Sequence, residues 1–172
     1  MIFTGEEIKK CVSKGKIIIN PFFKEDLNPN SYNYHLGHEI LELNDNLIDT
    51  KKPTNYKKII LKNSGYILKP GKTYLGHTNE EIGSEDYLTI LIGRSSVGRL
   101  GLFLQITADL GHVGLAHSWT LELHVVQPLK VYPLMKIGQV SFWEVIGKNK
   151  LEYEGKYHKY SLPHISEIYN EF

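Results

Sequence analysis

The sequence predicts a mainly β protein with one helix at the N-terminus. Short apolar or alternating runs recur along the chain, and clusters of turn-forming residues separate them. The 172 residues include 15 glycines and 7 prolines, which mark turns, and 11 tyrosines, which favour strands. A series of short strands with Gly and Pro turns indicates an all-β barrel or sandwich. The length fits one domain over residues 1–172.

The predicted helix lies at the start of the chain. Thr4 followed by Glu7 fits a capping box, in which each side chain satisfies a backbone N–H at the helix start. Ile8 and Cys11 lie on one apolar face at helical spacing. Gly15 follows as a C-terminal cap, so we expect the helix to end just before it.

The strands are predicted from the apolar runs that follow. The polar stretches 24–31 and 44–57 are predicted loops. We expect the range 32–43 to form strand, turn and strand, and the ranges 65–68 and 73–78 to form a hairpin around a Pro-Gly turn. The remaining strands are expected over 17–19, 59–61, 88–92, 103–108, 119–126, 129–134 and 137–145.

Composition excludes several classes of protein. The 20 basic and 19 acidic residues nearly cancel, which gives no support for a protein that coats nucleic acid. Cys11 is the only cysteine, so neither an internal disulfide nor a Cys-rich zinc site is expected. The N-terminus resembles no signal peptide, and no window approaches the roughly 20 apolar residues of a membrane span. We therefore expect a cytoplasmic protein with no membrane or nucleic-acid partner.

The glycine-rich segment 93–101 is the most informative stretch for chemistry. It reads Gly-Arg-Ser-Ser-Val-Gly-Arg-Leu-Gly and so combines Arg94 and Arg99 with the hydroxyls of Ser95 and Ser96. Glycines allow close backbone approach, and arginines hold phosphate oxygens bidentately. The pattern is neither a P-loop nor a dinucleotide fingerprint. A plain Gly-rich turn with an exposed arginine and an N-capping serine explains the segment equally well.

Glu122 interrupts a predicted strand, Thr-Leu-Glu-Leu. Alternation places it on the face opposite Leu121 and Leu123. If those leucines face the core, Glu122 faces either solvent or a cleft. In a cleft it would be a desolvated carboxylate suited to proton transfer.

Taken together, these motifs resemble a known family. Gly-Arg-Ser-Ser-Val-Gly-Arg-Leu-Gly-Leu, followed by the Leu-Glu-Leu strand, is similar to the dCTP deaminase branch of the trimeric dUTPase superfamily. The ranges 31–37, 68–80, 137–142 and 153–157 also resemble elements of that family, so the similarity covers nearly the whole chain in order.

The resemblance implies a fold, an assembly and a reaction. The fold would be a distorted β-barrel of jelly-roll type, assembled as a homotrimer with active sites between subunits. The family deaminates dCTP to dUTP and ammonia without zinc. Glu122 would activate the water, and Ser95 and Arg99 would complete the catalytic group. Zinc deaminases use a Pro-Cys-x-x-Cys signature, which this chain lacks.

The resemblance also implies how the nucleotide is held. Mg²⁺ would arrive with the triphosphate, and no protein-bound metal is expected. The range 148–172 would act as a C-terminal lid or arm. The implied substrate-binding residues are Arg94 and Ser96 for phosphates, Thr107 and Ala108 for the base, and His112, Gln139, Tyr153, Lys156 and Tyr160.

Several positions depart from the family pattern. His112 replaces an Asp that meets the sugar, Leu115 replaces an aromatic ring, and His117 replaces a Gly. Asn33 and His35 replace the Asp and Arg of a Ser-x-Asp-x-Arg element. The deaminase chemistry could then act on another cytosine nucleotide such as CTP, CMP or dCMP. A dUTPase-type or bifunctional enzyme that releases pyrophosphate, and a non-catalytic binder, remain alternatives.

Overall fold

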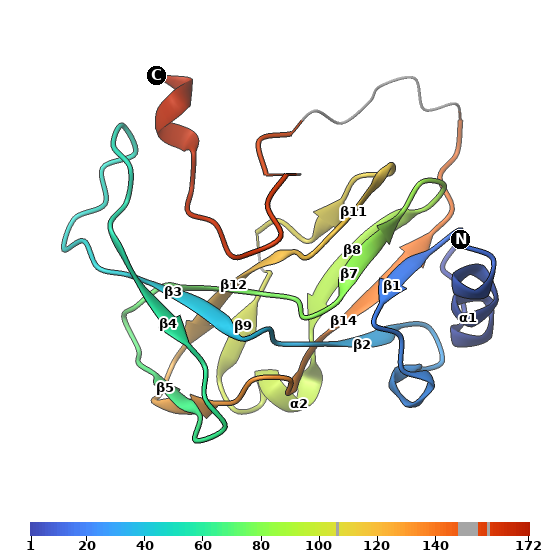
Figure 1. Cartoon of the computed structure of the whole chain (residues 1–172), viewed down its shortest axis with the longest axis horizontal. Helices are drawn as coiled ribbons and strands as arrows, with labels where there is room; N and C mark the ends of the chain where they lie inside the picture. Colours follow the sequence, from blue (N-terminus) through green and yellow to red (C-terminus); the bar gives the residue numbers. More distant parts are fainter. Residues whose placement is uncertain (106, 148–154, 158) are drawn as a thin grey trace.

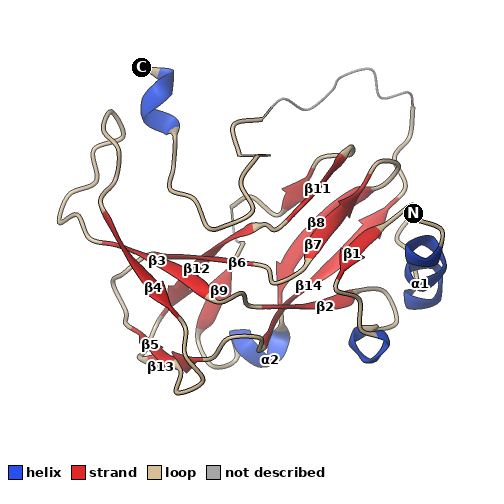
Figure 2. Ribbon diagram, viewed as in Figure 1, coloured by secondary structure: helices blue, strands red, loops and turns tan. Residues whose placement is uncertain are grey.

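The computed structural model describes residues 1–105, 107–147, 155–157 and 159–172. Figures 1 and 2 show a mainly β chain whose strands form four sheets, with helix α1 (Gly5–Ser13) packed at one side. The predicted fold class is therefore confirmed. Within the described ranges, no helix has the length and apolar character needed to cross a membrane.

All the strand pairs are antiparallel, and two sheets hold most of the strands. One has the order β10 (Leu110–Gly111), β8 (Leu88–Gly93), β14 (Lys136–Trp143) and β2 (Tyr32–His35). The other has the order β4 (Tyr56–Ile60), β3 (Glu39–Leu43), β6 (Tyr74–His77), β12 (Thr120–Val125) and β9 (Leu102–Leu104). The two small sheets are β1 (Ile18–Asn20), β7 (Glu81–Ser84) and β11 (Leu115–His117), and β13 (Leu129–Val131) with β5 (Tyr66–Leu68).

Helix α1 forms where the sequence predicts it, but half of the expected capping box is replaced: the Glu7 carboxylate accepts from Lys10 Nζ at 3.1 Å. The Thr4 hydroxyl accepts a hydrogen bond from the Glu7 backbone N–H at 3.3 Å, as an N-cap does. Ile8 and Cys11 are buried on the inner face. Gly15 follows the helix with a φ of +69°, the left-handed conformation that ends many helices.

The core is built from alternating strand residues and from tyrosines. On β12, Leu121 and Leu123 are fully buried, so their face points inward. Tyr34 and Tyr74 are also fully buried, and the Tyr34 hydroxyl donates to the Ile92 carbonyl at 3.1 Å. Several of the abundant tyrosines therefore pack as core residues with a satisfied polar end.

The hairpin predicted over 65–68 and 73–78 is wrong. β5 pairs with β13, whereas β6 lies between β3 and β12 in the five-stranded sheet. Tyr74 and Leu75 point to opposite faces of β6 and are both buried, so β6 is an interior strand with neighbours on both sides. The Pro-Gly turn does form, with Gly71 at a φ of +74°, but it carries the chain from one sheet to another.

Two further expectations need correction. The strand expected over 103–108 ends at Leu104, because Gln105 has a φ of +49° and cannot continue a strand. The glycine-rich segment 93–101 is not a plain loop but contains the one-turn helix α2 (Ser95–Gly98), which is anchored by buried Val97. Strands β7 (Glu81–Ser84), β10 (Leu110–Gly111) and β11 (Leu115–His117) were not predicted.

A cluster of four charged or titratable side chains ties separate elements together. Asp26 follows Glu25 in the short 3-10 helix η1 (Lys24–Asp26) and pairs with Lys136 of β14 at 2.5 Å. His35 of β2 contacts Glu80 through its Nδ1 and lies 3.6 Å from Asp26 through its Nε2. Asp26 and Glu80 are almost completely buried, and burial raises the pKa of Glu80.

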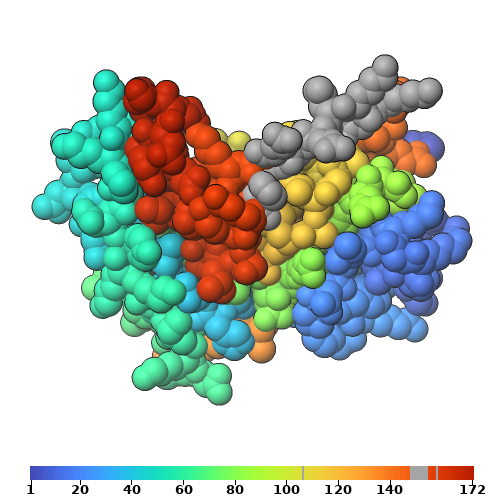
Figure 3. Space-filling view, turned by 45° about the horizontal axis from the view of Figure 1, so that its top comes forward, coloured from blue at the N-terminus to red at the C-terminus, as the bar shows by residue number. Residues whose placement is uncertain are grey.

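The C-terminal residues fold back across the molecule. They end in the short 3-10 helix η2 (Ile168–Glu171). Figure 3 shows this segment, in red, lying against the part of the chain that carries β3 and β4. The backbone N–H of His164 donates to the Thr120 hydroxyl at 3.3 Å, which fixes the segment on strand β12.

Candidate active site

The larger cavity lies between strand β12 and the C-terminal segment. Its volume is about 640 Å³, which suits a nucleotide-sized ligand. Strands β6 and β12 supply one wall, the β10–β11 region a second, and Tyr157, Tyr160 and residues 164–166 a third. Glu122 of strand β12 is one of the residues that line the cavity.

Strand alternation explains why Glu122 faces this cavity. Leu121 and Leu123 are fully buried on the opposite face of β12, whereas Glu122 is half-buried. Of the two positions that the sequence left open for Glu122, solvent and cleft, the structure has the cleft. The carboxylate is thus held on a rigid strand at the edge of a partly enclosed space.

Gln105 supports Glu122 and is a residue that the sequence did not single out. Its side-chain Oε1 accepts from the Glu122 backbone N–H at 3.0 Å. Its Nε2 donates to the Ala108 carbonyl at 3.1 Å. Both contacts depend on the positive φ of Gln105, which no pattern of polar and apolar residues predicts.

Two ring pairs give the cavity aromatic walls. On the strand side, the His117 and Trp119 ring centroids are 4.1 Å apart, and the Trp119 indole donates to the Ile82 carbonyl at 2.8 Å. On the C-terminal side, Tyr160 stacks on His164 with centroids 3.6 Å apart. Such flat apolar surfaces suit a heterocyclic base.

The C-terminal ring pair is held by Glu167. The Tyr160 hydroxyl donates to Glu167 Oε1 at 2.5 Å, and His164 Nε2 lies 3.1 Å from the same oxygen. The hydrogen bond from Tyr160 lowers the pKa of Glu167 and raises that of Tyr160. Tyr157 adds its hydroxyl, which accepts from the Glu167 backbone N–H at 2.9 Å.

The structure brings together some of the residues proposed from sequence. Glu122, Ala108, His112 and Tyr160 all line the larger cavity. Thr107 is exposed beside Ala108 and is not among the lining residues.

Two other proposed binding residues do not line this cavity, and a third lies outside the described residues. Gln139 donates to Asn33 Oδ1 at 3.2 Å, in the four-stranded sheet. Lys156 binds Glu171 at 2.5 Å. Tyr153 lies outside the described residues.

The serine residues of α2 and the arginine residues that flank it lie away from Glu122 within one chain. Ser95, Ser96 and Arg99 are exposed, and none of them lines the cavity, nor does half-buried Arg94. Segment 94–101 leads into β9 at the Leu102–Val125 pair, and three residues of strand, roughly 10 Å, separate that pair from Glu122. Figure 1 shows α2 on the side of the molecule opposite the C-terminal segment.

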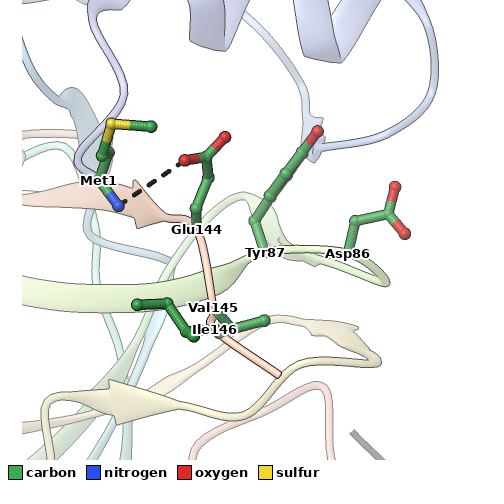
Figure 4. A pocket seen from close by; sticks show the side chains of 6 residues that line it. All are labelled: Met1, Asp86, Tyr87, Glu144, Val145 and Ile146. Atoms are coloured by element: carbon green, nitrogen blue, oxygen red, sulfur yellow. Dashed lines mark ion pairs between the residues drawn. The ribbon is translucent and has the colours of Figure 1, made fainter. Parts of the chain in front are cut away.

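A second cavity is smaller and carries none of the proposed site residues. Its volume is about 390 Å³. Figure 4 shows its lining side chains, among them the Met1 amino group 3.8 Å from Glu144, with Tyr87 and Asp86 beside them. Its apolar members, Val145 and Ile146, are exposed, so this hollow is shallow.

In the part of the chain that the structure describes, no three His, Cys, Asp or Glu side chains are grouped so that they could hold a metal ion.

Comparisons with known proteins agree on one family. The family model described as dCTP deaminase-like matches residues 2–145. A Clostridium botulinum protein named "dCTP deaminase, dUMP-forming" is 42% identical over all of this chain and 99% of its own length. A Rhodopirellula baltica protein named "dCTP deaminase" is 42% identical over 91% of this chain and 79% of its own.

A solved structure supports the fold. The 2'-deoxycytidine 5'-triphosphate deaminase of Agrobacterium tumefaciens matches with a TM-score of 0.65 at 19% identity. The match covers 82% of this chain and 47% of that one. With the family match and the full-length relatives, these findings confirm the resemblance seen in the sequence: the chain belongs to the dCTP deaminase-like family.

Proposed function

We propose that this protein removes the amino group of dCTP by hydrolysis of the C4–N4 bond, with Glu122 as the residue that activates water. The observation that carries the proposal is the placement of Glu122 on the cavity face of β12, close to the loop at Ala108. Relatives that share the full length of the chain are named dCTP deaminases. A carboxylate in a partly enclosed cavity is suited to move a proton in both directions.

The proposed reaction uses one carboxylate twice. Glu122 takes a proton from water, and the resulting hydroxide attacks C4 of the cytosine ring. Glu122 then gives that proton to N3, which forms a tetrahedral intermediate. Glu122 next takes the proton of the new C4 hydroxyl and passes it to N4. The C4–N4 bond then breaks, N4 leaves as ammonia, and the C4 oxygen becomes the carbonyl of uracil. The reaction is proposed to need no zinc, in keeping with a chain that has a single cysteine.

We infer that the site is completed by a neighbouring copy of the chain. Ser95 and Arg99 are proposed to assist Glu122, yet they are exposed and lie outside its cavity in the same chain. A cyclic homotrimer would bring α2 of one subunit to the Glu122 cavity of the next. Exposed Phe103 and Leu100 beside α2 add apolar surface to such an interface.

The remaining binding roles are proposed for the same site between two subunits. We propose that Arg94 and Ser96 bind phosphates across the interface and that Thr107 and Ala108 meet the base. His112 and Tyr160 line the cavity, and we propose that they border the sugar and the phosphates. The C-terminal segment, with Lys156 and Tyr153, is proposed to close over the nucleotide, and Gln139 to support the site. Mg²⁺ is proposed to enter with the triphosphate as part of the substrate, in a cytoplasmic enzyme.

A second candidate is a bifunctional enzyme that forms dUMP. The names of the Clostridium botulinum and Cytophaga hutchinsonii relatives favour it. Release of pyrophosphate needs a second water. His112 stands where the family pattern has the Asp that positions this water, and the loss of that Asp argues against pyrophosphate release. Product analysis separates the two candidates, because dUTP alone indicates deamination only, whereas dUMP with pyrophosphate indicates both reactions.

The substitution E122Q tests the mechanism. It keeps the size of the side chain but removes its proton-accepting carboxylate, so turnover of dCTP should fall by about 10³-fold or more. Nucleotide binding, measured by calorimetry, should stay within about threefold of the parent protein. Assays with CTP, dCMP and CMP beside dCTP identify the preferred nucleotide. Full activity of E122Q would refute the role of Glu122.

A further inference from the structure

Gln105 is the residue outside the proposed catalytic group that the structure ties most directly to Glu122. It lines the cavity, yet its side chain is 8% exposed and makes two hydrogen bonds to the backbone. We infer that Gln105 is a positioning residue that sets both Glu122 and the loop at Ala108 for reaction. The inference rests on the proposed function and adds a residue to which that proposal gives no role.

The first contact of Gln105 extends the sheet by means of a side chain. The pairing of β9 with β12 ends at Leu104 and Leu123. The next residue of β12 beyond this pair is Glu122, and its backbone N–H points toward the side of the sheet where β9 lies. β9 has ended by then, and the Gln105 Oε1 takes the place of the missing carbonyl at 3.0 Å. The backbone that carries the Glu122 carboxylate is therefore fixed by this amide.

The second contact holds the loop that faces the base. Gln105 Nε2 donates to the Ala108 carbonyl at 3.1 Å, and Ala108 lines the cavity. One planar amide thus links the strand of the proposed base catalyst to the loop proposed to meet the cytosine. The spacing between Glu122 and that loop is set by the length of a single side chain.

The backbone of Gln105 adds an independent observation. Its φ of +49° lies in the left-handed region, which a long side chain rarely adopts. Such conformations persist where surrounding contacts impose them, and they cluster at functional sites. Here the turn points the amide back toward β12, which is the direction both hydrogen bonds require.

Two substitutions separate the two hydrogen bonds. Q105L keeps much of the volume but removes both, so kcat should fall by about 10²-fold, since small displacements of reacting groups have effects of that size. Q105E keeps the acceptor for the Glu122 N–H but loses the donor to Ala108. It also adds a negative charge that opposes ionisation of Glu122, so the acidic limb of the pH–rate profile should move to higher pH.

Ser84 provides a matched control for the loss of a buried polar bridge. It is 1% exposed, and its hydroxyl donates to the Lys16 carbonyl at 2.6 Å and accepts from the Tyr87 N–H at 3.0 Å. S84A should lower the thermal unfolding midpoint but leave kcat and the pH profile as in the parent protein. If S84A reduces kcat as much as Q105L does, the effect follows stability and the inference fails.

A readout without turnover keeps this test separate from the proposed function. Exchange of the Glu122 amide hydrogen, followed by NMR in the full chain, should speed up at least about tenfold in Q105L and stay unchanged in Q105E and S84A. Unchanged exchange in Q105L would overturn the inference even if the parent protein deaminates dCTP. An inactive parent protein would refute the proposed function, while the exchange result would still decide the role of Gln105.

Discussion

At the scale of single residues, His77 is the side chain whose protonation the fold opposes. It is half-buried on β6, and burial lowers its pKa. Its Nδ1 bonds to the Thr78 carbonyl at 2.9 Å, and among the described residues its buried Nε2 has no hydrogen-bond partner. A proton on that nitrogen would place an unpaired charge inside the protein.

The sign of the resulting pH dependence follows from linkage. The unfolded chain binds a proton on His77 near pH 6.5, and the folded chain binds it only at lower pH. The contribution of His77 to stability is therefore complete above pH 6.5 and is lost as the pH falls. H77N keeps a donor for the Thr78 carbonyl but does not titrate.

Thermal unfolding at pH 7.5 and 5.5 measures this effect. The drop in the unfolding midpoint between these values should be smaller in H77N than in the parent protein. The control is H124N, because His124 is an exposed histidine on β12, the strand next to β6, and it should keep the drop of the parent protein. An equal drop in H77N and the parent protein would contradict the assignment.

The residues of the candidate site were predictable to different degrees. Glu122 could be placed because the alternation of β12 depends only on neighbouring residues, and Leu121 and Leu123 are indeed buried. Gln105 could not, because its role comes from a positive φ and from two partners at positions 108 and 122. His164 reaches Thr120 across 44 residues of sequence, a contact that no local pattern contains.

At the scale of elements, the buried cluster of Asp26, His35, Glu80 and Lys136 joins η1, β2, the β6–β7 connection and β14. The Glu80 carboxylate accepts from the His35 backbone N–H at 2.9 Å as well as contacting the imidazole. Its side chain is fully buried. Removing one partner of such a cluster leaves the others as uncompensated charges in the interior.

E80A should therefore be strongly destabilising. The free energy of unfolding in urea at pH 7 should fall by about 3–5 kcal/mol, the usual cost of breaking a buried ion pair. E81A is the matched control, since Glu81 is the next residue and is exposed, and its effect should stay within about 0.5 kcal/mol. A loss in E80A as small as that in E81A would show that the cluster does not join these elements.

Elements were predicted well where signals in neighbouring residues suffice, and poorly where the pairing with distant strands determines the structure. Helix α1 has a cap, an apolar face and a closing glycine within one short segment, and it forms as predicted. The runs that became β5 and β6 flank a true Pro-Gly turn, yet they pair with β13, and with β3 and β12. Pairing between distant strands depends on which strand edges remain free in the folded sheet. The apolar run that predicts a strand carries no information about this.

At the scale of the whole molecule, the proposed catalytic group is divided between two surfaces. Glu122 lies in the cavity under the C-terminal segment. Ser95 of α2 and Arg99 just after it are exposed and lie beyond the Leu102–Val125 pair, which is itself roughly 10 Å along the sheet from Glu122. A cyclic assembly offers a direct test of this division. E122Q and R99A should each be inactive alone, because every site in either oligomer lacks one group.

Mixed oligomers of the two inactive variants should regain activity. When the chains are unfolded together in equal amounts and refolded, about one quarter of the sites should pair an intact Glu122 with an intact Arg99 from the neighbour. A mixture of S95A with R99A is the matched control: both changes lie in the segment 94–101 that one chain supplies, so no site receives a complete set. Mixed oligomers verified by mass spectrometry that stay as inactive as this control would place the whole site within one chain.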